Sequence, residues 1–402
     1  MPYNTYKLLL IAGIIISALA FSCIYNKENF SIAPVSASAK QLENQEDLIT
    51  FLENAKSDKE RKKIFEDNRT IINSDFIIFI LKKANEQFDV TSIADKSNNS
   101  FNTVIIDHKE GDIENLIRKY RELACDNMTP EKLKSSEWKE ISKKLYNILF
   151  KDGEKYMKKR ILVSPHKMLH YLPFQVMSDD KGMMLVEKYD ISYLPSASVL
   201  KYCQKKNTLK KEKLLAFDLG NFKADELPSL PGTEEEIKAI SEYFPLKEAY
   251  SGKDMATEIL YKKGGDFDIL HLATHGILDT NSPLFSSLVF SDRRLNVYEI
   301  FELNLKAYLV TLSACKTGFS EDARGDELVG LSRAFIYAGT PTICSSLWDV
   351  SDRATSELMK SFYFHLRDKN KTEALRLAQL DIMKKYHHPF FWAPFVLTGD
   401  WR

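Results

Sequence analysis

A histidine and a cysteine stand at comparable places in two short motifs of this sequence, and together they could carry out nucleophilic catalysis. The motif HLATHG runs from His271 to Gly276, and LSACKTG runs from Leu312 to Gly318. Each motif follows an apolar, strand-like run and places His275 or Cys315 where the strand is expected to give way to a glycine-containing loop. A free thiol is weakly ionised at neutral pH, so a nearby imidazole that accepts its proton activates it. The pair predicts cysteine nucleophilic catalysis, with His275 later protonating the leaving group.

The two histidines of the first motif are expected to play different parts. Alternation along a strand puts His271, Ala273 and His275 on one face. Only His275 adjoins a glycine, so it is expected at the open end of the strand, while His271 is expected deeper, as a buried and hydrogen-bonded histidine. Two histidines four residues apart can also bind a metal ion, but the glutamate of a HExxH motif is missing. The sequence therefore predicts neither a metal site nor a cofactor.

The backbone at the same positions could stabilise a negatively charged intermediate. A loop that starts at Gly276 would leave its N–H group without a strand partner, and the N–H group of Cys315 is expected at the end of its own strand. Two such donors form an oxyanion hole, in which one donor typically lowers the barrier by about 3 kcal/mol. Taken alone, Cys315 is better explained as a buried core cysteine at the end of a strand. A histidine on a neighbouring strand end favours catalysis.

The elements around these motifs indicate an α/β protein. From about Arg160 onward, strand-like apolar runs alternate with helix-like segments, which predicts a mostly parallel sheet flanked by helices. Sites in such sheets lie beyond the carboxyl ends of the strands. A helix is expected within 231–244, with Thr233 as its cap and Glu235 and Glu236 in its first turn, where the helix dipole favours acids. The framing strands are expected at 268–273, 307–313 and 342–347, and the later helices at 326–338, 355–366 and 371–384.

Together, the motifs resemble those of the CHAT family of caspase-like cysteine peptidases. GDELVGLSRAFIYAGTPTICSSLWDVSDRAT follows the two motifs, and LHYLPFQVM, LPGTEEEI and HHPFFWAPFVLTGDW add to the likeness, which covers about residues 101–402. The resemblance implies a caspase-hemoglobinase-like fold and hydrolysis of peptide bonds by a dyad of Cys315 and His275. It also implies an oxyanion hole made by the backbone amides of Gly276 and Cys315. SACKTG departs from the caspase pattern and carries Lys316 where CHAT proteins often have Glu or Gln, so aspartate specificity is not expected.

The stretch SSLWDVSD is similar to the corresponding stretch of separase, a relative that cleaves after arginine. There an aspartate lines the pocket for the basic side chain of the substrate. By position, Asp352 is the first choice for that role here and Asp349 the second. A carboxylate facing Arg or Lys is a strong device for specificity. The competing interpretation is that Asp352 caps a helix that begins near Thr355.

The N-terminal third differs in kind from the rest. Lys7 precedes the apolar run LLLIAGIIISALAF, and Cys23 follows it, which resembles a bacterial lipoprotein processing site. Residues 1–25 are therefore expected to be a signal peptide, a lipoprotein signal or a membrane anchor, with a buried helix of the folded domain as the remaining alternative. A flexible tether is expected at 26–45, a helical N-terminal segment at 46–100 and the CHAT domain at 101–402. This organisation predicts that the protein is exported or associated with a membrane.

The composition narrows the class of partner. The 56 Lys and Arg residues balance the 56 Asp and Glu residues and no basic face is evident, which argues against nucleic acid. A protein or peptide substrate is expected, together with a possible activating protein. Three of the five cysteines, Cys125, Cys203 and Cys344, are expected to be buried apolar residues rather than disulfide partners. Two rival functions remain, a catalytically latent or inactive CHAT scaffold and a thiol acyltransferase or other non-peptidase cysteine enzyme.

Overall fold

The computed structural model describes residues 77–84, 87–93, 101–195, 199–206, 210–224, 227–279, 281–317, 326–349 and 352–402. The leader expected at 1–25 and the tether expected at 26–45 lie outside these residues. Among the helices that the structure describes, none is both long and apolar enough to cross a membrane.

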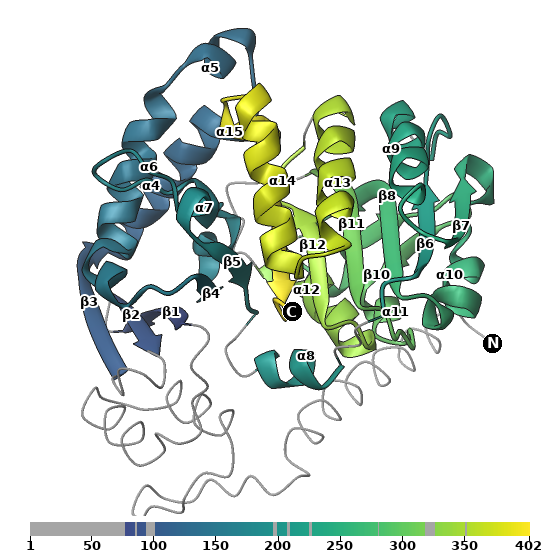
Figure 1. Cartoon of the computed structure of the whole chain (residues 1–402), viewed down its shortest axis with the longest axis horizontal. Coiled ribbons are helices and arrows are strands. Elements are labelled where there is room, and N and C mark those ends of the chain that lie inside the picture. Colours follow the sequence, from purple (N-terminus) through teal and green to yellow (C-terminus); the bar gives the residue numbers. More distant parts are fainter. Residues whose placement is uncertain are drawn as a thin grey trace, which may run out of the picture. The chain divides into compact units, whose positions relative to one another are not determined.

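Within the described residues, thirteen strands form one mixed sheet in which most neighbours are parallel (Figure 1). The strand order is β10-β9-β8-β11-β12-β13-β5-β4-β1-β2-β3, and β6 and β7 continue the sheet from β8. This agrees with the predicted α/β class. The strands are β1 (Ile77–Ala84), β2 (Gln87–Ile93), β3 (Phe101–Lys109), β4 (Arg160–Ser164), β5 (Asp190–Tyr193), β6 (Lys213–Asp218), β7 (Leu246–Ser251), β8 (Ile269–Ile277), β9 (Ser287–Val289), β10 (Arg294–Asn296), β11 (Leu309–Thr317), β12 (Thr342–Ser346) and β13 (Phe395–Gly399).

Helices cover both faces of this sheet. One core packs β6, β8 and β11 against α9, α13 and α14, and the other packs the opposite faces of the same strands against α10, α11 and α12. Alternate residues of each strand therefore serve different cores, as in sheets buried on both sides. The helices are α4 (Glu110–Ala124), α5 (Pro130–Lys134), α6 (Glu137–Leu149), α7 (Leu185–Lys188), α8 (Leu200–Lys206), α9 (Pro231–Ser241), α10 (Thr257–Lys263), α11 (Val297–Ile300), α12 (Asp326–Ala338), α13 (Asp352–Leu366), α14 (Lys371–Lys385) and α15 (Pro389–Trp392).

Within the segment expected to be helical at 46–100, the helix is wrong over Ile77–Ala84, which forms β1 instead. Gln87–Ile93 forms β2, in agreement with a weak strand-like pattern at Phe88–Ile93. β1 pairs with β2 on one side and, in parallel, with β4 on the other. A continuous apolar run such as that of β1 has no periodicity that separates a helix from a strand, and pairing with β4 decides the outcome. The part of the expected helix before residue 77 lies outside the described residues.

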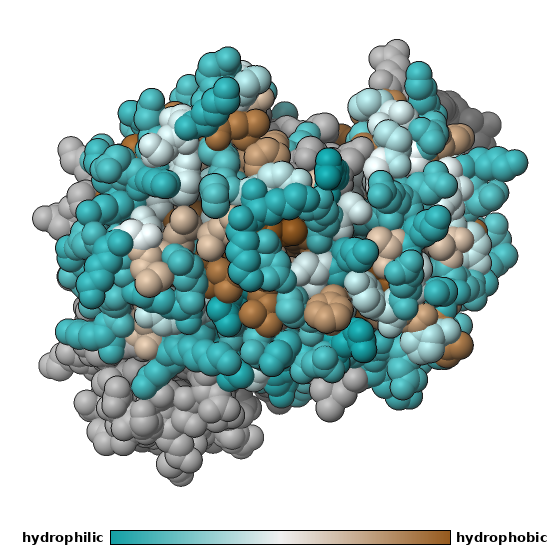
Figure 2. Space-filling model, turned by 45° about the horizontal axis from the view of Figure 1, so that its top comes forward, coloured by the Kyte–Doolittle hydropathy of each residue, from teal (hydrophilic) through white to brown (hydrophobic). Residues whose placement is uncertain are grey.

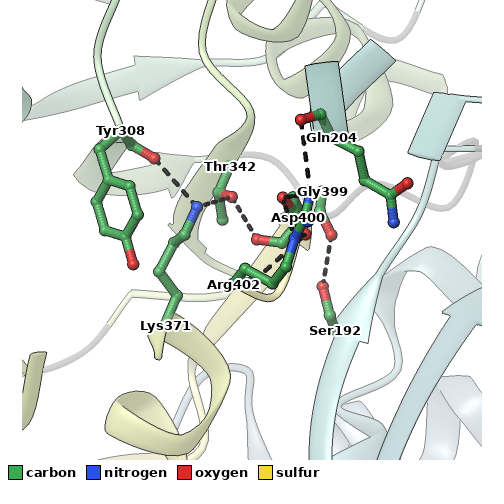
Figure 3. A network of polar contacts seen from close by, with 8 residues as sticks. All are labelled: Ser192, Gln204, Tyr308, Thr342, Lys371, Gly399, Asp400 and Arg402. Atoms are coloured by element: carbon green, nitrogen blue, oxygen red, sulfur yellow. Dashed lines mark hydrogen bonds and ion pairs between the residues drawn. The ribbon is translucent and has the colours of Figure 1, made fainter. Parts of the chain in front are cut away.

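The amino ends of β11 and β12 are closed by a buried polar network around the C-terminus (Figure 3). The Nζ atom of Lys371 donates to Thr342 Oγ1 at 2.7 Å and to the carbonyl oxygen of Tyr308 at 3.3 Å. Thr342 Oγ1 in turn donates to the carbonyl oxygen of Asp400 at 2.5 Å. The Asp400 carboxylate pairs with Arg402, whose terminal nitrogen lies 2.9 Å away. This network fixes the last residues of the chain against the sheet, and we call it the amino-edge network.

The surface of the described residues is mainly hydrophilic. Figure 2 shows hydrophilic residues over most of one side, with hydrophobic residues only in small, separate groups. Cys125, Cys203 and Cys344 are buried with free thiols, which confirms the expectation for these three. Burial raises the pKa of Cys203 to about 12, so this thiol stays protonated and unreactive at neutral pH.

Candidate active site

His275 and Cys315 occupy opposed positions on two neighbouring parallel strands. β8 and β11 pair continuously from Leu309↔Ile269 to Thr317↔Ile277, and Cys315 stands directly opposite His275. Neighbouring strands lie about 4.8 Å apart, and opposed residues share one face of the sheet. In Figure 1 the chain descends from α15 to the C-terminus through β13, so β12 and its parallel neighbours run upward and end at the upper edge. The structure therefore brings the two predicted residues together at the carboxyl edge of the sheet.

The ring of His275 is held in one tautomer. Its Nε2 atom lies 2.8 Å from the carbonyl oxygen of Pro228. Because a carbonyl oxygen can only accept, Nε2 carries the proton, and Nδ1 is the basic nitrogen of the neutral ring. Nδ1 is buried and has no hydrogen-bond partner among the described residues, and the side chain is only 3% exposed. His275 thus offers an unused base that is shielded from solvent.

At the level of His275 and Cys315, the strands on either side of β8 and β11 stop pairing with them. β6 pairs with β8 up to Asp218↔Ala273, and β9 joins β8 only from Gly276 onward. On the other side, β12 pairs with β11 up to Leu312↔Ser345. His275 therefore lies between the end of one neighbouring strand and the start of another, and Cys315 lies beyond the last residue that β12 pairs. Steps of this kind at the carboxyl edge give ligands access to strand ends.

His271 is the buried, hydrogen-bonded histidine that the sequence predicts. It is fully buried, with Nδ1 3.0 Å from the Tyr363 hydroxyl and Nε2 2.8 Å from Glu236 Oε1. The predicted alternation along the strand also holds, because Ala273 packs into the core under α9 and α13 while Leu270 and Leu272 pack into the other core.

The expectation that β8 ends at Gly276 is wrong. β8 continues through Ile277 and β11 through Thr317, so Gly276 is paired with Lys316 on one side and with Leu288 of β9 on the other. The short antiparallel strand β9 supplies the pairing that a glycine-based turn prediction leaves out. The oxyanion role of the Gly276 and Cys315 amides stays a prediction.

The two aspartates expected to line a specificity pocket follow the carboxyl end of β12, the strand next to that of Cys315. Asp349 is exposed, and Asp352 is the first residue of α13. The helix begins at Asp352 rather than near Thr355, which places Asp352 in its first turn, where the helix dipole favours an acidic residue. Three adjacent strand ends thus carry His275, Cys315 and these two aspartates.

A further carboxyl group, Asp218, lies at the same edge and was not predicted. It ends β6 opposite Ala273 and is fully buried. Ser251 Oγ donates to its Oδ2 at 2.5 Å, while its Oδ1 has no partner among the described residues. Burial raises the pKa of Asp218, and the nearby Glu234 raises it further. The signal in the sequence was an aspartate that ends the apolar run KLLAF.

Pro228 and Glu236 were also missed as site residues. Pro228 acts through its carbonyl oxygen, for which side-chain patterns hold no signal. Glu236 was expected in the first turn of a helix capped by Thr233, but α9 begins at Pro231 with Leu230 at its N-cap, and Glu236 is only 2% exposed. Its spacing of four residues from Ile240, which places it on the buried face of the helix, was the available signal. Among the residues whose side chains are described, no cluster of three or more His, Cys, Asp or Glu is arranged to hold a metal ion.

Comparison with solved structures defines the class of fold. Two crystal structures of the Saccharomyces cerevisiae separase–securin complex match 88% of this chain with TM-scores of 0.50 and 0.52, at 10% and 11% identity, and the match covers 32% of the matched chain. The molecule therefore has a caspase-like α/β fold, with a mostly parallel central sheet flanked by helices.

Sequence comparison then places the chain within a family. The model of the CHAT domain matches residues 139–400, more than half of the chain, so this protein belongs to the CHAT domain family. Tetratricopeptide repeat protein 28 of Mus musculus is 33% identical over 115 residues, and that of Homo sapiens is 31% identical over 111 residues. Each match covers 26% of this chain and 4% of the relative, so this chain spans only a small part of those proteins.

Proposed function

We propose that this protein is a cysteine endopeptidase of the CHAT family, with Cys315 as nucleophile and His275 as general base. The observation that carries the proposal is the hydrogen bond from His275 Nε2 to the Pro228 carbonyl oxygen. It leaves Nδ1 as an unpartnered base on the residue opposed to Cys315. A structural histidine at this depth is expected to have a polar atom close to each ring nitrogen, as His271 has in the Tyr363 hydroxyl at 3.0 Å and Glu236 Oε1 at 2.8 Å.

The proposed reaction follows from this arrangement. His275 Nδ1 takes the proton of the Cys315 thiol, and the thiolate attacks the peptide carbonyl carbon. The imidazolium keeps its Nε2–H bond to Pro228, which becomes charge-assisted and so stronger. His275 then gives the proton from Nδ1 to the leaving amine, and water hydrolyses the acyl-enzyme. The backbone amides of Gly276 and Cys315 are our candidates for holding the oxyanion.

A preference for basic residues at the cleaved bond is the finer part of the proposal. Asp352 and Asp349 follow the end of β12, which pairs with the strand that carries Cys315. A carboxylate there would pair with an Arg or Lys side chain that enters from the carboxyl edge.

The test is a peptide-library cleavage assay on the full-length chain, with Cys315→Ala and His275→Ala variants. The proposal expects cleavage by the wild type, enriched for Arg or Lys before the scissile bond, and none above background by either variant. Cleavage that survives Cys315→Ala would refute it. If the wild type is also inactive, labelling by an electrophile with a P1 arginine separates the alternatives: Cys315-dependent labelling indicates a latent peptidase, and no labelling indicates an inactive scaffold.

The proposal also covers export or membrane attachment of the protein and its protein partners. We propose that the apolar residues 8–21 export or anchor the protein, because one cation and a run of this length are typical of a leader. A protein partner is proposed by analogy with separase, whose matched structures contain securin. The mass of the mature chain after membrane fractionation tests the first point: an intact, soluble chain would contradict it.

A further inference from the structure

Behind His275 and Cys315, five buried side chains form a closed set of polar contacts that joins both strands to both covering helices. His271 comes from β8, Thr311 and Ser313 from β11, Glu236 from α9 and Tyr363 from α13. All five are at most 8% exposed, so each of these contacts replaces water that the side chains have lost. The proposed catalytic function uses none of them, and their presence needs its own explanation.

The contacts have a direction that ends on Glu236. Glu236 Oε2 accepts from Ser313 Oγ at 3.2 Å, and Glu236 Oε1 lies 2.8 Å from His271 Nε2. Since a carboxylate can only accept, Nε2 carries the proton, and Nδ1 of the neutral His271 ring accepts from the Tyr363 hydroxyl at 3.0 Å. Burial raises the pKa of Tyr363 well above its usual value, which keeps this hydroxyl protonated.

Tyr363 closes the set on the other strand. Its oxygen lies 2.8 Å from Thr311 Oγ1, which can donate to it. Hydrogen-bond donors on both β8 and β11 are therefore oriented toward the Glu236 carboxylate, either directly or through a neighbouring side chain. Burying that carboxylate costs several kcal/mol unless it is well paired, and an apolar residue would pack there at less cost. A buried polar network in which the carboxylate oxygens lie 3.2 Å from Ser313 Oγ and 2.8 Å from His271 Nε2 instead favours one arrangement of the elements that it joins.

The position of Glu236 indicates which elements the network holds in place. Ser313 lies two residues before Cys315, and His271 lies four residues before His275. Toward the carboxyl edge, β6 no longer pairs with β8 beyond Ala273, and β12 no longer pairs with β11 beyond Leu312, so these two strands give the pair less lateral support. Glu236 bridges the two strands just where this lateral support ends.

The same helix is tied to the loop that holds His275. Thr233 Oγ1 in α9 accepts from the Gly220 amide at 3.2 Å, and the Leu230 amide donates to the Gly220 carbonyl oxygen at 2.7 Å. These bonds close the loop that carries Pro228, the partner of His275 Nε2. α9 thus contacts both strands and the loop that orients the base.

We propose that Glu236 is a positioning residue, whose buried carboxylate bridges β8 and β11 and thereby keeps His275 aligned with Cys315. The inference rests on the proposed function, because it assigns Glu236 a part in the action of that dyad. Glu236 itself does not contact the reacting groups.

The test measures the reactivity of Cys315 rather than peptide cleavage. The rate of Cys315 alkylation by iodoacetamide is followed against pH by mass spectrometry of the full-length chain. An aligned histidine lowers the pH at which the thiol reacts, and a rise of one unit in that midpoint slows alkylation at neutral pH by about tenfold. The variants are Glu236→Leu, Glu236→Gln and Ser313→Ala, with Glu235→Leu on the exposed side of α9 as matched control.

Glu236→Leu is expected to move the midpoint toward that of His275→Ala, with alkylation at neutral pH slower by about tenfold. Glu236→Gln keeps an acceptor of the same shape and is expected to retain more reactivity than Leu. Ser313→Ala removes one donor and is expected to fall between wild type and Glu236→Leu, while Glu235→Leu matches wild type. Where cleavage is measurable, the loss is expected in kcat rather than KM, because substrate contacts are untouched.

The outcomes separate the two proposals. If His275→Ala shifts the wild-type profile but Glu236→Leu and Ser313→Ala do not, the positioning role is overturned and the dyad stands. If His275→Ala leaves the profile unchanged, the dyad itself is overturned, and the role of Glu236 with it. Should Glu236→Leu fail to fold, Glu236→Gln and Ser313→Ala still decide between these results.

Discussion

The central strands carry a buried polar network at each edge, and the two networks differ in how completely their atoms are paired. In the amino-edge network, the Lys371 amine, the Thr342 hydroxyl and the Asp400 carboxylate all have partners (Figure 3). At the carboxyl edge, His275 Nδ1 and Asp218 Oδ1 are buried without a partner among the described residues. Each such atom forfeits about 1–3 kcal/mol of stability.

The difference shows which edge is organised for stability and which for chemistry. A closed network gains by having no atom left over, whereas a base must keep a free lone pair for the proton that it will take. Functional sites are where proteins accept such local costs. Substitutions at the amino edge should therefore change stability, and those at the carboxyl edge should change reactivity.

The largest effect is expected from His275→Leu. Removing the base should lower cleavage by at least about a hundredfold, because general base catalysis is typically worth that much or more. The melting temperature should change little, because the gain from removing a buried nitrogen without a partner offsets the loss of the hydrogen bond to the Pro228 carbonyl oxygen. Cleavage assays and thermal unfolding, with exposed His387→Leu as control, measure both. Unchanged cleavage, or a melting temperature several degrees lower, would contradict the assignment of the carboxyl edge to reactivity and the amino edge to stability.

The next effect is expected at the amino edge, from Gly399→Ala. Gly399 has a φ of +116°, and an added Cβ would lie 2.2 Å from the Pro341 carbonyl oxygen. The variant should lose at least about 3 kcal/mol of unfolding free energy, because backbone must move to admit the methyl group. Gly182→Ala is the matched control: its φ is +78° but nothing lies within 4 Å of the added Cβ. It should lose only about 1 kcal/mol, the cost of the backbone conformation alone. Equal losses in urea unfolding would show that the close approach at Gly399 is unimportant.

The sequence predicted the residues at these edges better than their surroundings. The apolar runs before His275 and Cys315 predicted that both residues lie near the carboxyl ends of their strands, although β8 and β11 continue to Ile277 and Thr317. Helix α12 (Asp326–Ala338) was predicted with its observed bounds. Neither the opposed register of the two residues nor the partner of His275 could be read from the sequence, because the first depends on strand pairing and the second is a backbone carbonyl.

The errors have a common physical origin in tertiary pairing. Ile77–Ala84 was expected to be helical and is a strand because β4 and β2 pair with it. Gly276 was expected to open a loop and stays in β8 because β9 pairs with it. Glu236 was expected in the first turn of a helix and is buried because α9 starts earlier and faces β8 and β11. In each case a long-range contact outweighed a local preference.

A smaller effect, dependent on pH, is expected from Lys371→Met. Burial lowers the pKa of Lys371 to about 7, while an unfolded lysine titrates near 10.4. Between these values the unfolded chain holds a proton that the folded chain has released, so the contribution of Lys371 to the unfolding free energy rises with pH across this window. The difference between wild type and Lys371→Met should therefore shift in favour of the wild type by about 1–2 kcal/mol from pH 7 to pH 8.5. Urea unfolding at several pH values measures it, and a difference independent of pH would mean that the lysine titrates normally.

The smallest effect is expected from Asp218→Asn. This variant should raise the stability of the fold, whereas removing a paired charge would lower it. Burial raises the pKa of Asp218, so the folded chain holds its proton more tightly than the unfolded chain does. As pH rises through the unfolded and then the folded pKa, stability falls, and above both values the full cost of the buried charge remains. Asp218→Asn removes that charge while its oxygen can still accept from Ser251. The variant should be more stable than wild type at neutral pH by about 1 kcal/mol and should differ little from it below pH 3. Thermal unfolding at both pH values tests this, with Ser251→Ala as control for the hydrogen bond.

Lower stability of Asp218→Asn at neutral pH would show that Asp218 Oδ1 has a partner after all. Lost cleavage at unchanged stability would instead place Asp218 in contact with substrate, and the carboxyl edge would then hold two reactive groups instead of one reactive pair and one strained neighbour.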